Sequence, residues 1–123
     1  MSNLTTSDQE IDRNQWNAVF TSITNEYRGV HAQLELLGQD LGDQTPVEDS
    51  NFDGISADTK DGEDVVWIAF GNDQFSRGIH GVTAVRMLPA NGTNGPVIEV
   101  EAQDGTRTLL HLGIPGDHAL PPA

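Results

Sequence analysis

The most regular hydrophobic pattern in the chain lies close to its N-terminus. Apolar side chains recur there every three or four positions, which is the spacing of one face of an amphipathic helix: Trp16, Val19, Phe20, Ile23 and Tyr27. Asp12 and Gln15 have the spacing of a capping box, in which side chains bond free backbone amides at the start of a helix. Gly29 can supply the left-handed residue that ends many helices. The pattern predicts a helix over residues 13–28.

Beyond Gly29 the pattern changes to the period of two that is typical of β-strands. Alternating apolar and polar residues predict a half-buried strand over 30–37, and a second short strand is expected over 52–58. The run 65–70 is apolar at every position, which predicts a central strand covered on both faces. A fourth strand is expected over 79–88.

The last two expected strands, 97–102 and 106–112, are joined by a turn at 103–105. A two-residue loop would place glutamates opposite a leucine and a threonine. A three-residue loop with a left-handed glycine would pair Glu101 with Arg107 and apolar residues with one another. We expect the second register, because it pairs apolar residues with apolar residues and places opposite charges across the strands.

Together these elements are one helix followed by five or six strands with short connections. Short connections favour pairing between strands that are neighbours in the sequence. We therefore expect an α+β fold, with an N-terminal amphipathic helix packed on a five- to six-stranded, mainly antiparallel, curved sheet or partly open barrel. The 123 residues suit one domain, which we place at 11–113, between a flexible N-terminus (1–10) and an irregular C-terminal tail (114–123).

The excess of acidic over basic residues limits which kinds of partner the chain can bind. Nineteen acidic residues oppose six basic ones, and the formal net charge is −13. Such a chain repels nucleic acids and anionic membranes, so we expect it to bind neither. Two interpretations of the acidity remain open: an ordinary soluble acidic protein, or a protein from a halophile, whose high internal salt screens the self-repulsion. The second fits the near-absence of lysine, since Lys60 is the only one.

Composition and the N-terminal sequence exclude further classes. The chain has no cysteine, which rules out disulfides, zinc–thiolate sites and thiol nucleophiles. The N-terminal residues lack the basic and apolar segments of a signal peptide, and no apolar run approaches the roughly 18 residues that cross a bilayer. We expect a soluble, cytoplasmic protein without a cofactor.

One stretch begins like the calcium-binding loop of an EF-hand. Its matching residues are Asp49, Asn51, Asp53 and Gly54, at loop positions 1, 3, 5 and 6. Position 12, however, is Lys60 where the loop requires a bidentate glutamate, and strands rather than helices are expected nearby. We therefore predict no metal site and interpret 49–53 as a solvated turn. The carboxylates that follow could form a second solvated turn, which we favour, or a weaker cation site: Asp58, Asp61, Glu63 and Asp64.

Few residues stand out as candidates for chemistry. The sequence has no G-x-S-x-G element, no phosphate-binding glycine loop and no helical pair of histidines, so we predict no catalytic residue. His80 lies beside a small residue that leaves room next to it, and Trp67 could line a pocket. A structural histidine and a core tryptophan are the simpler interpretations. The candidate ligand-binding residues are His80, Trp67, Asp58 and Lys60.

Several blocks, spread over most of residues 11–112, share a pattern of apolar, glycine and aspartate positions. They are IDRNQWNAVF, HAQLELLGQDLGDQ (31–44), FDGISADTKDGEDVVWIAFG (52–71), His80 and EAQDGTRTLLHL (101–112). The pattern resembles a family of short bacterial proteins described only as a domain of unknown function. The resemblance implies an N-terminal helix with an antiparallel sheet, and makes Asp58 and Lys60 part of a shared pattern. It implies no activity or cofactor. The segment GVTAVRML departs from it, because the family often has a proline shortly after the histidine.

Three functions remain open on the sequence. The first choice is a non-catalytic, soluble cytoplasmic module that binds a protein partner, or associates with itself, through the strand edges of an open sheet. The alternative is a domain that binds a small ligand in a pocket near Trp67 and His80. The third is an acid–base enzyme that uses His80 with Asp58 or Asp64.

The halophilic interpretation predicts how stability depends on salt. The melting temperature, followed by circular dichroism, should rise between low and molar potassium chloride, because screening weakens the repulsion among the acidic side chains. An unchanged melting temperature over that range would contradict the interpretation.

Overall fold

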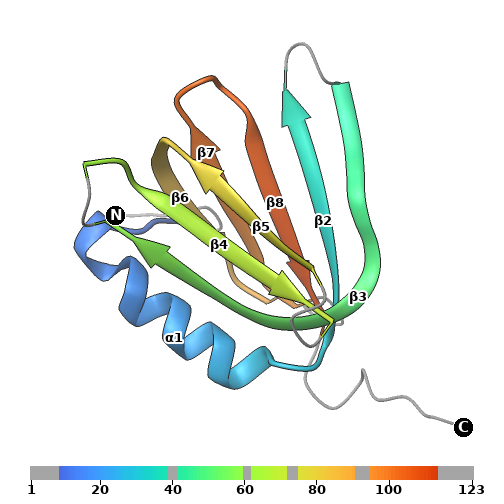
Figure 1. Ribbon diagram of the computed structural model, residues 1–123. Helices are drawn as coiled ribbons and strands as arrows, with labels where there is room; N and C mark the ends of the chain where they lie inside the picture. The colour runs from blue at the N-terminus through green and yellow to red at the C-terminus, as the bar shows by residue number, and fades with distance from the viewer. Residues whose placement is uncertain (1–8, 39–41, 60–61, 72–74, 91–94, 114–123) are drawn as a thin grey trace, which may run out of the picture.

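The computed structural model describes residues 9–38, 42–59, 62–71, 75–90 and 95–113. One α-helix precedes nearly all of an antiparallel sheet, so the predicted α+β fold is confirmed (Figure 1). The elements in chain order are β1 (Gln9–Glu10), the 3-10 turn η1 (Arg13–Gln15), α1 (Trp16–Tyr27), β2 (His31–Gly38), β3 (Gly42–Asp58), β4 (Val65–Phe70), β5 (Phe75–His80), β6 (Val82–Leu88), β7 (Val97–Ala102) and β8 (Arg107–Leu112).

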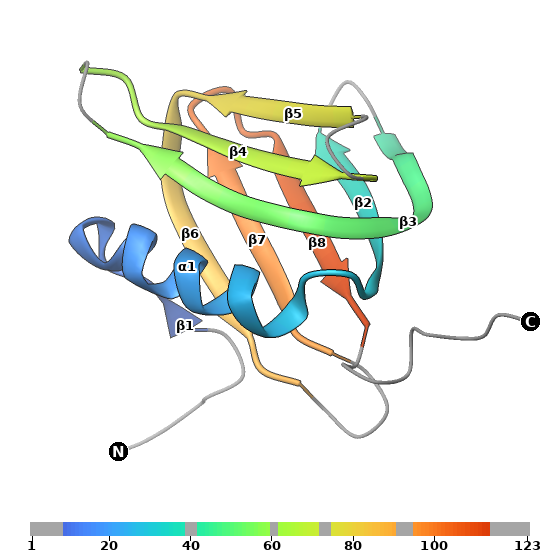
Figure 2. The same ribbon diagram turned by 60° about the horizontal axis from the view of Figure 1, so that its bottom comes forward.

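The sheet has eight strands in the order β1-β6-β7-β8-β2-β3-β4-β5, which is more than the five or six expected. One addition is the two-residue β1, and the other arises because the expected strand 79–88 is divided at Gly81. Gly81 has a φ of 66°, and the chain turns a corner there from β5 to β6. β5 is the last strand in the sheet order and β6 is the second, so this corner joins the two ends of the sheet. The sheet curls, and β3, β4 and β5 cross over β6, β7 and β8 (Figures 1 and 2).

The helix α1 covers one end of the curled sheet and packs against β3 (Figure 2). Its buried residues come from the predicted apolar stripe: Trp16, Phe20 and Ile23. They join one continuous core with the inward-facing residues of the strands. Burying each such side chain contributes about 1.5–3 kcal/mol, so this face holds the helix in place. Among the described residues, no helix is long and apolar enough to cross a membrane.

The start of the helix differs from the prediction, whereas its end agrees with it. The side chain of Asp12 makes no capping hydrogen bond. Instead, the backbone carbonyl of Asp12 accepts a hydrogen bond from the amide of Gln15 at 2.8 Å, which produces the tighter 3-10 turn before α1 begins at Trp16. Gly29 has a φ of 93°, the left-handed conformation that was expected after the helix.

The calcium-like stretch lies inside a strand, and its interpretation as a solvated turn is wrong. β3 is 17 residues long and includes 49–53, whereas only a short strand over 52–58 was expected. Its first part pairs with β2, its last part pairs with β4, and the register shifts between Phe52 and Gly54. Phe52 is fully buried in the core. Pairing on two sides and this burial outweigh the turn preference of the aspartates and asparagine around it.

The expectation that the apolar run 65–70 is covered on both faces is also wrong. β4 lies between β3 and β5, but its side chains alternate between the core and the surface. Val66 and Ile68 are fully buried, while Trp67 is 43% exposed. The curled sheet encloses a single interior, so only one face of β4 meets the core.

The hairpin between β7 and β8 has the expected register. Glu101 pairs with Arg107, and Ile98 pairs with Leu110. Gly105 has a φ of 88°, and its amide donates to the carbonyl of Ala102 at 2.9 Å. The three-residue loop is thereby confirmed.

Thr24 connects α1 to β3, and its loss should destabilise the fold. Its hydroxyl donates to the carbonyl of Ile55 at 3.2 Å and accepts from the Ile55 amide at 3.0 Å. Thr24→Val leaves both backbone groups without this partner, so we expect the free energy of unfolding to fall by about 1–3 kcal/mol, measured by urea denaturation.

Thr83→Val is the matched control. The Thr83 hydroxyl is exposed and donates a single bond, to the carbonyl of Glu101 at 3.2 Å. Water can replace this bond, so the control should change stability by less than about 0.5 kcal/mol. Equal losses in the two variants would show that the Thr24 bridge has no special role.

Candidate functional site

A cleft of about 330 Å³ opens between β5 and the wall formed by β2, β7 and β8. The end of β2 and the turn between β7 and β8 lie at the opposite end of the curled sheet from α1 (Figures 1 and 2). The helix therefore does not cover this part of the interior. The residues around the cleft are Leu36, Arg77, Gly78, Ile79, His80, Ala102, Asp104, Thr106 and Thr108.

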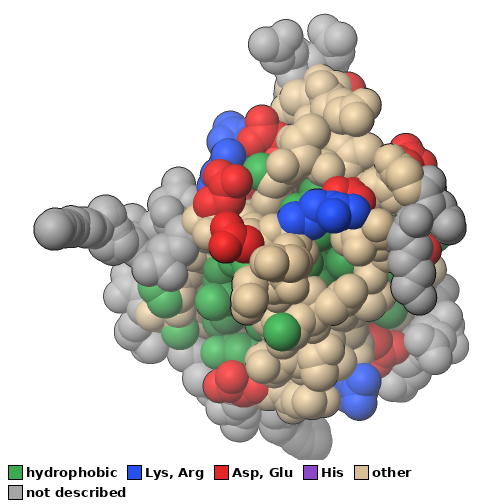
Figure 3. All heavy atoms as spheres, turned by 90° about the vertical axis from the view of Figure 1, so that its left-hand side faces the viewer, with side chains coloured by type: hydrophobic (Ala, Val, Ile, Leu, Met, Phe, Trp, Pro, Cys, Tyr) green, Lys and Arg blue, Asp and Glu red, His purple; other side chains and the backbone are tan. Residues whose placement is uncertain are grey.

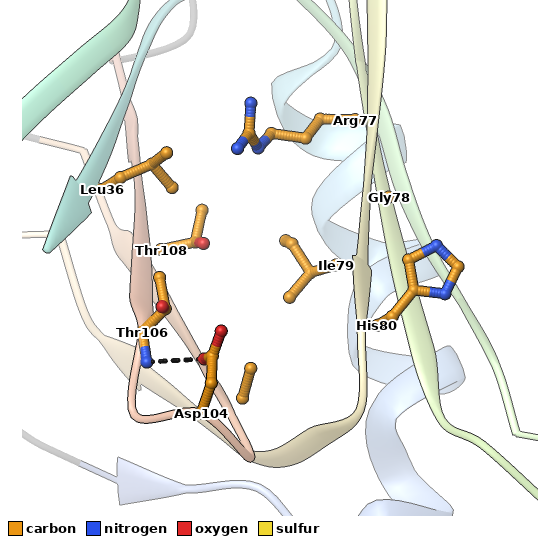
Figure 4. Close-up of a pocket in the computed structure, with 9 residues that line it drawn as sticks. Leu36, Arg77, Gly78, Ile79, His80, Asp104, Thr106 and Thr108 are labelled. Atoms are coloured by element: carbon orange, nitrogen blue, oxygen red, sulfur yellow. Dashed lines mark hydrogen bonds between the residues drawn. The ribbon is translucent and has the colours of Figure 1, made fainter. Parts of the chain in front are cut away.

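Arg77 occupies an inward-facing position of β5. It is paired across the strands with the fully buried Ile68, and it alternates in phase with the buried Ile79. Its guanidinium projects into the cleft (Figure 4). The residue is half-buried, and it makes no hydrogen bond or ion pair with any residue that the structure describes. A cation therefore faces the cleft, and none of the described residues uses its donors.

The other arginines in the described ranges all have partners. Three of them donate hydrogen bonds: Arg13 to the Asp64 carboxylate, Arg28 to the backbone carbonyl of Asp53, and Arg86 to Glu99 and Glu101. Arg107 forms an ion pair with Glu99 at 3.5 Å. On the face shown in Figure 3, basic side chains lie among acidic ones. In a chain with 19 acidic residues such pairing is expected, so the unpaired Arg77 is the exception within this part of the chain.

Thr108 places a hydroxyl on the opposite wall of the cleft. It takes the inward position of β8 that Leu110 and Leu112 take further along the strand, and it is 1% exposed. Its side chain points toward the space between β8 and β5 (Figure 4). Within the described residues the hydroxyl has no hydrogen-bond partner. Leaving such a group unsatisfied costs about 1–3 kcal/mol, so a water or a ligand in the cleft is the natural partner.

Asp104 places a negative charge at the mouth of the cleft. Its carboxylate accepts a hydrogen bond from the backbone amide of Thr106 at 2.9 Å (Figure 4). That bond, and then the Thr106 hydroxyl, lower the pKa of Asp104. The carboxylate is therefore ionised at neutral pH. The cleft has a cation on one side, an anion at its mouth, and apolar and hydroxyl-bearing side chains between them.

The structure brings Trp67 and His80 together, but on the outer face of the β4–β5 pair. Their ring centroids are 6.0 Å apart and the rings meet edge to face at 76°. Trp67 lies over Gly78, where a Cβ atom would come within 2.6 Å of the indole ring. The His80 ring points away from the cleft (Figure 4). These two residues form a surface aromatic pair, separated from the cleft by the strand itself.

The other candidate site residues are Asp58, which lies near this pair, and Lys60, which lies outside the described ranges. Asp58, Val65 and His80 form one row across β3, β4 and β5. His80 lies 3.5 Å from the carboxylate of Glu63, and both side chains are more than half exposed. Lys60 is outside the described residues. Within the described ranges, no group of three potential ligand side chains could hold a metal.

Asp64 is held by Arg13 rather than by His80. Nε of Arg13 donates to the Asp64 carboxylate at 2.6 Å and a terminal nitrogen donates at 2.9 Å. These hydrogen bonds lower the pKa of Asp64. Asp64 is therefore an anchored carboxylate on the surface, and the acid–base pair His80–Asp64 is not assembled in this structure.

Comparison with known proteins identifies the family. A family described as "Family of unknown function (DUF5335)" matches residues 7–121. The chain belongs to this family. An uncharacterised protein of Aquifex aeolicus (strain VF5) is 31% identical over 104 residues, which cover 83% of this chain and 88% of that protein. The family resemblance noted in the sequence is thereby confirmed.

A solved structure shows a more distant similarity. The pleckstrin homology (PH) domain of USP37 superimposes with a TM-score of 0.44 at 9% sequence identity, over 68% of this chain and 80% of that domain. A similarity at this level carries no information about function. In this DUF5335 protein the residues of the cleft are the features that bear on function.

The two cleft residues with unused hydrogen-bonding groups were not among the sequence candidates. Arg77 lies just before the strand expected over 79–88 and so outside any expected strand, although its two-residue spacing from Phe75 and Ile79 places all three on one face of β5. Thr108 lies within the strand expected over 106–112, in phase with the buried Leu110 and Leu112. In both cases the signal was a polar residue at an inward-facing position.

The Arg13–Asp64 pair predicts a pH-dependent contribution to stability. The pKa of Asp64 is lowered in the folded protein, so the stabilisation is fully present above the ordinary pKa of aspartate. It is lost as the pH falls through the lowered pKa. We expect Asp64→Asn to reduce the melting temperature at pH 7 by on the order of a few degrees, and the difference from wild type to vanish in acid.

Glu63→Gln provides the control for that measurement. Glu63 is the neighbouring carboxylate, and it lies 3.5 Å from His80 with more than half of each side chain exposed, so the contact is screened by water. Its variant should melt close to wild type. A melting temperature of Asp64→Asn equal to that of wild type at pH 7, or a difference that persists at low pH, would contradict the assignment.

Proposed function

We propose that this DUF5335 protein is a non-catalytic binding domain whose small ligand occupies the cleft between β5 and the β2–β7–β8 wall. The observation that carries the proposal is a pair of polar groups there, the Arg77 guanidinium and the Thr108 hydroxyl, neither of which has a partner among the described residues. Both occupy inward-facing strand positions, where apolar residues would stabilise the fold more. Polar groups at such positions are typical of a binding site.

The volume and lining of the cleft support a small ligand. About 330 Å³ is at the lower end of the range for small-molecule sites. Leu36, Ile79 and Ala102 provide apolar contact. The polar groups of Arg77, Thr108 and Asp104 lie at separate points around Leu36 and Ile79 (Figure 4). Such sites take affinity from the apolar contact and orientation from the few polar groups.

The chemistry of the cleft favours binding over catalysis. Arginine stays protonated at every ordinary pH, so Arg77 can donate hydrogen bonds but cannot take up a proton. Asp104 is kept ionised by Thr106 and so is a poor proton donor near neutrality. The ring of His80, the strongest acid–base candidate, is on the other face of β5.

A second candidate function is the binding of a protein partner. β5 is the last strand in the sheet order, and among the described residues only β4 pairs with it. The two large hydrophobic side chains that are exposed in this part of the chain lie on β4 and β5, namely Trp67 at 43% and Phe75 at 40%. An extended segment of a partner, or of a second copy, could pair with such an edge.

The strong negative charge of the chain bears on its location and partners. We propose that the domain acts in the cytoplasm and binds neither nucleic acid nor membranes, because the net charge of −13 repels both. A halophilic origin remains a prediction that the salt dependence of the melting temperature tests.

A fragment screen by NMR tests the cleft-binding proposal. In amide correlation spectra of the full chain, we expect fragments to shift the amides of Arg77, Ile79 and Thr108. Ala102→Leu extends a side chain into the cleft and should reduce these shifts at least fivefold.

Ala69→Leu is the matched control, because it makes the same change at an outward-facing position of β4. Fragments should still shift the cleft amides in this variant. The proposal is wrong if no fragment shifts them, or if Ala102→Leu responds like wild type.

A further inference from the structure

We propose that the ligand of the cleft is a monocarboxylate with a short apolar chain, held by Arg77 and Thr108. The inference rests on the function proposed above and adds the chemical class of the ligand. Arg77 and Thr108 face the same space from opposite walls, β5 and β8 (Figure 4). The apolar side chains beside them, Leu36, Ile79 and Ala102, receive the chain of the ligand.

Arg77 determines the sign of the ligand's charge. A guanidinium has donors and no acceptor, so its partner must present lone pairs. Nineteen acidic residues are present in the chain, yet none in the described ranges reaches Arg77. The planar fork of donors matches the two oxygens of a carboxylate and can bind it in a bidentate manner. A half-buried cation of this kind gains more from an anion than from water.

Thr108 supplies a second donor to the same group. Its hydroxyl is 1% exposed and has no partner among the described residues. A hydroxyl can donate one hydrogen bond to a carboxylate oxygen that Arg77 already contacts. Each threonine hydrogen bond to a charged group contributes more than one to a neutral group, so the pair favours a carboxylate over an amide or alcohol.

The surroundings exclude ligands of higher charge. Asp104 is ionised at the mouth of the cleft, and the whole chain carries a net charge of −13. Both repel a phosphate or a dicarboxylate more strongly than a monocarboxylate. Only one arginine lines the cleft to offset that repulsion. A single negative charge beside an apolar chain satisfies Arg77 with the least repulsion. Two sources share this chemistry: a free short-chain carboxylate and the C-terminal carboxylate of a peptide.

Titration with matched small probes tests the ligand class. The probes are sodium hexanoate, hexanamide and hexylammonium, added to the isotopically labelled full chain at pH 7 and 0.15 M salt. We expect hexanoate to bind at least tenfold more tightly than hexanamide, with shifts at the amides of Ile79 and Thr108, and hexylammonium to bind no more tightly than hexanamide. The peptide N-acetyl-Gly-Val-Leu with a free or an amidated C-terminus forms a second arm. Tighter binding of its free form than of hexanoate identifies a chain terminus as the source.

Two variants separate binding from stability. Arg77→Met and Thr108→Val keep the approximate shape of the side chain and remove the unused polar group, so both should melt at or above the temperature of wild type. Arg77→Met should abolish the preference for hexanoate, and Thr108→Val should weaken hexanoate binding at least threefold. A residue retained only for structure would instead lower the melting temperature when replaced.

Arg107→Met is the control for net charge. It makes the same change of charge on β8, where Arg107 is paired with Glu99 outside the cleft. It should retain the preference for hexanoate. Equal binding of hexanoate and hexanamide, or an equal loss in Arg77→Met and Arg107→Met, overturns the carboxylate assignment. If fragments occupy the cleft while the carboxylates do not, this inference fails and the cleft-binding function stands.

Discussion

Burial of one helix face inside a curled sheet is the contact on which the rest of the structure depends. Trp16, Phe20 and Ile23 fill one end of the interior, and the Thr24 hydroxyl fixes β3 against the helix. A helix of 12 residues is only about 18 Å long. It can cover one end of an eight-stranded sheet but not both. The interior therefore remains open between β5 and β8, where the cleft lies.

Outside the cleft, Glu99 and the arginines beside it have partners of opposite charge, whereas Arg77 in the cleft has none among the described residues. Glu99 is 8% exposed, yet it is held by Arg86 at 3.2 Å and by Arg107 at 3.5 Å. A buried charge with two opposite charges beside it is stable, whereas a lone one is costly. Arg77 and Thr108 depart from this rule because their partners are absent from the described part of the chain.

The residues that stand out by type lie on the outer face of the β4–β5 pair, whereas the cleft lies on the inner face. Histidine and tryptophan attract attention in a sequence, and His80 and Trp67 do meet in the structure. They share the outer face of β4 and β5, however, and the cleft opens on the inner face. Successive side chains of a strand point to opposite faces, so a shift of one residue decides which face a group serves. Arg77 and Ile79 lie on the inner face for this reason.

The sequence by itself determined the features that depend on neighbouring residues. These include the buried stripe of α1, the left-handed Gly29, and the β7–β8 register that pairs Glu101 with Arg107. Only the tertiary structure decided that β3 continues through the calcium-like stretch, because partners on β2 and β4 hold it extended. It also decided which face of β4 meets the core and where Arg77 points. These outcomes depend on how the sheet closes over one short helix. Contacts between segments that are distant in the sequence determine that closure, and local sequence patterns do not.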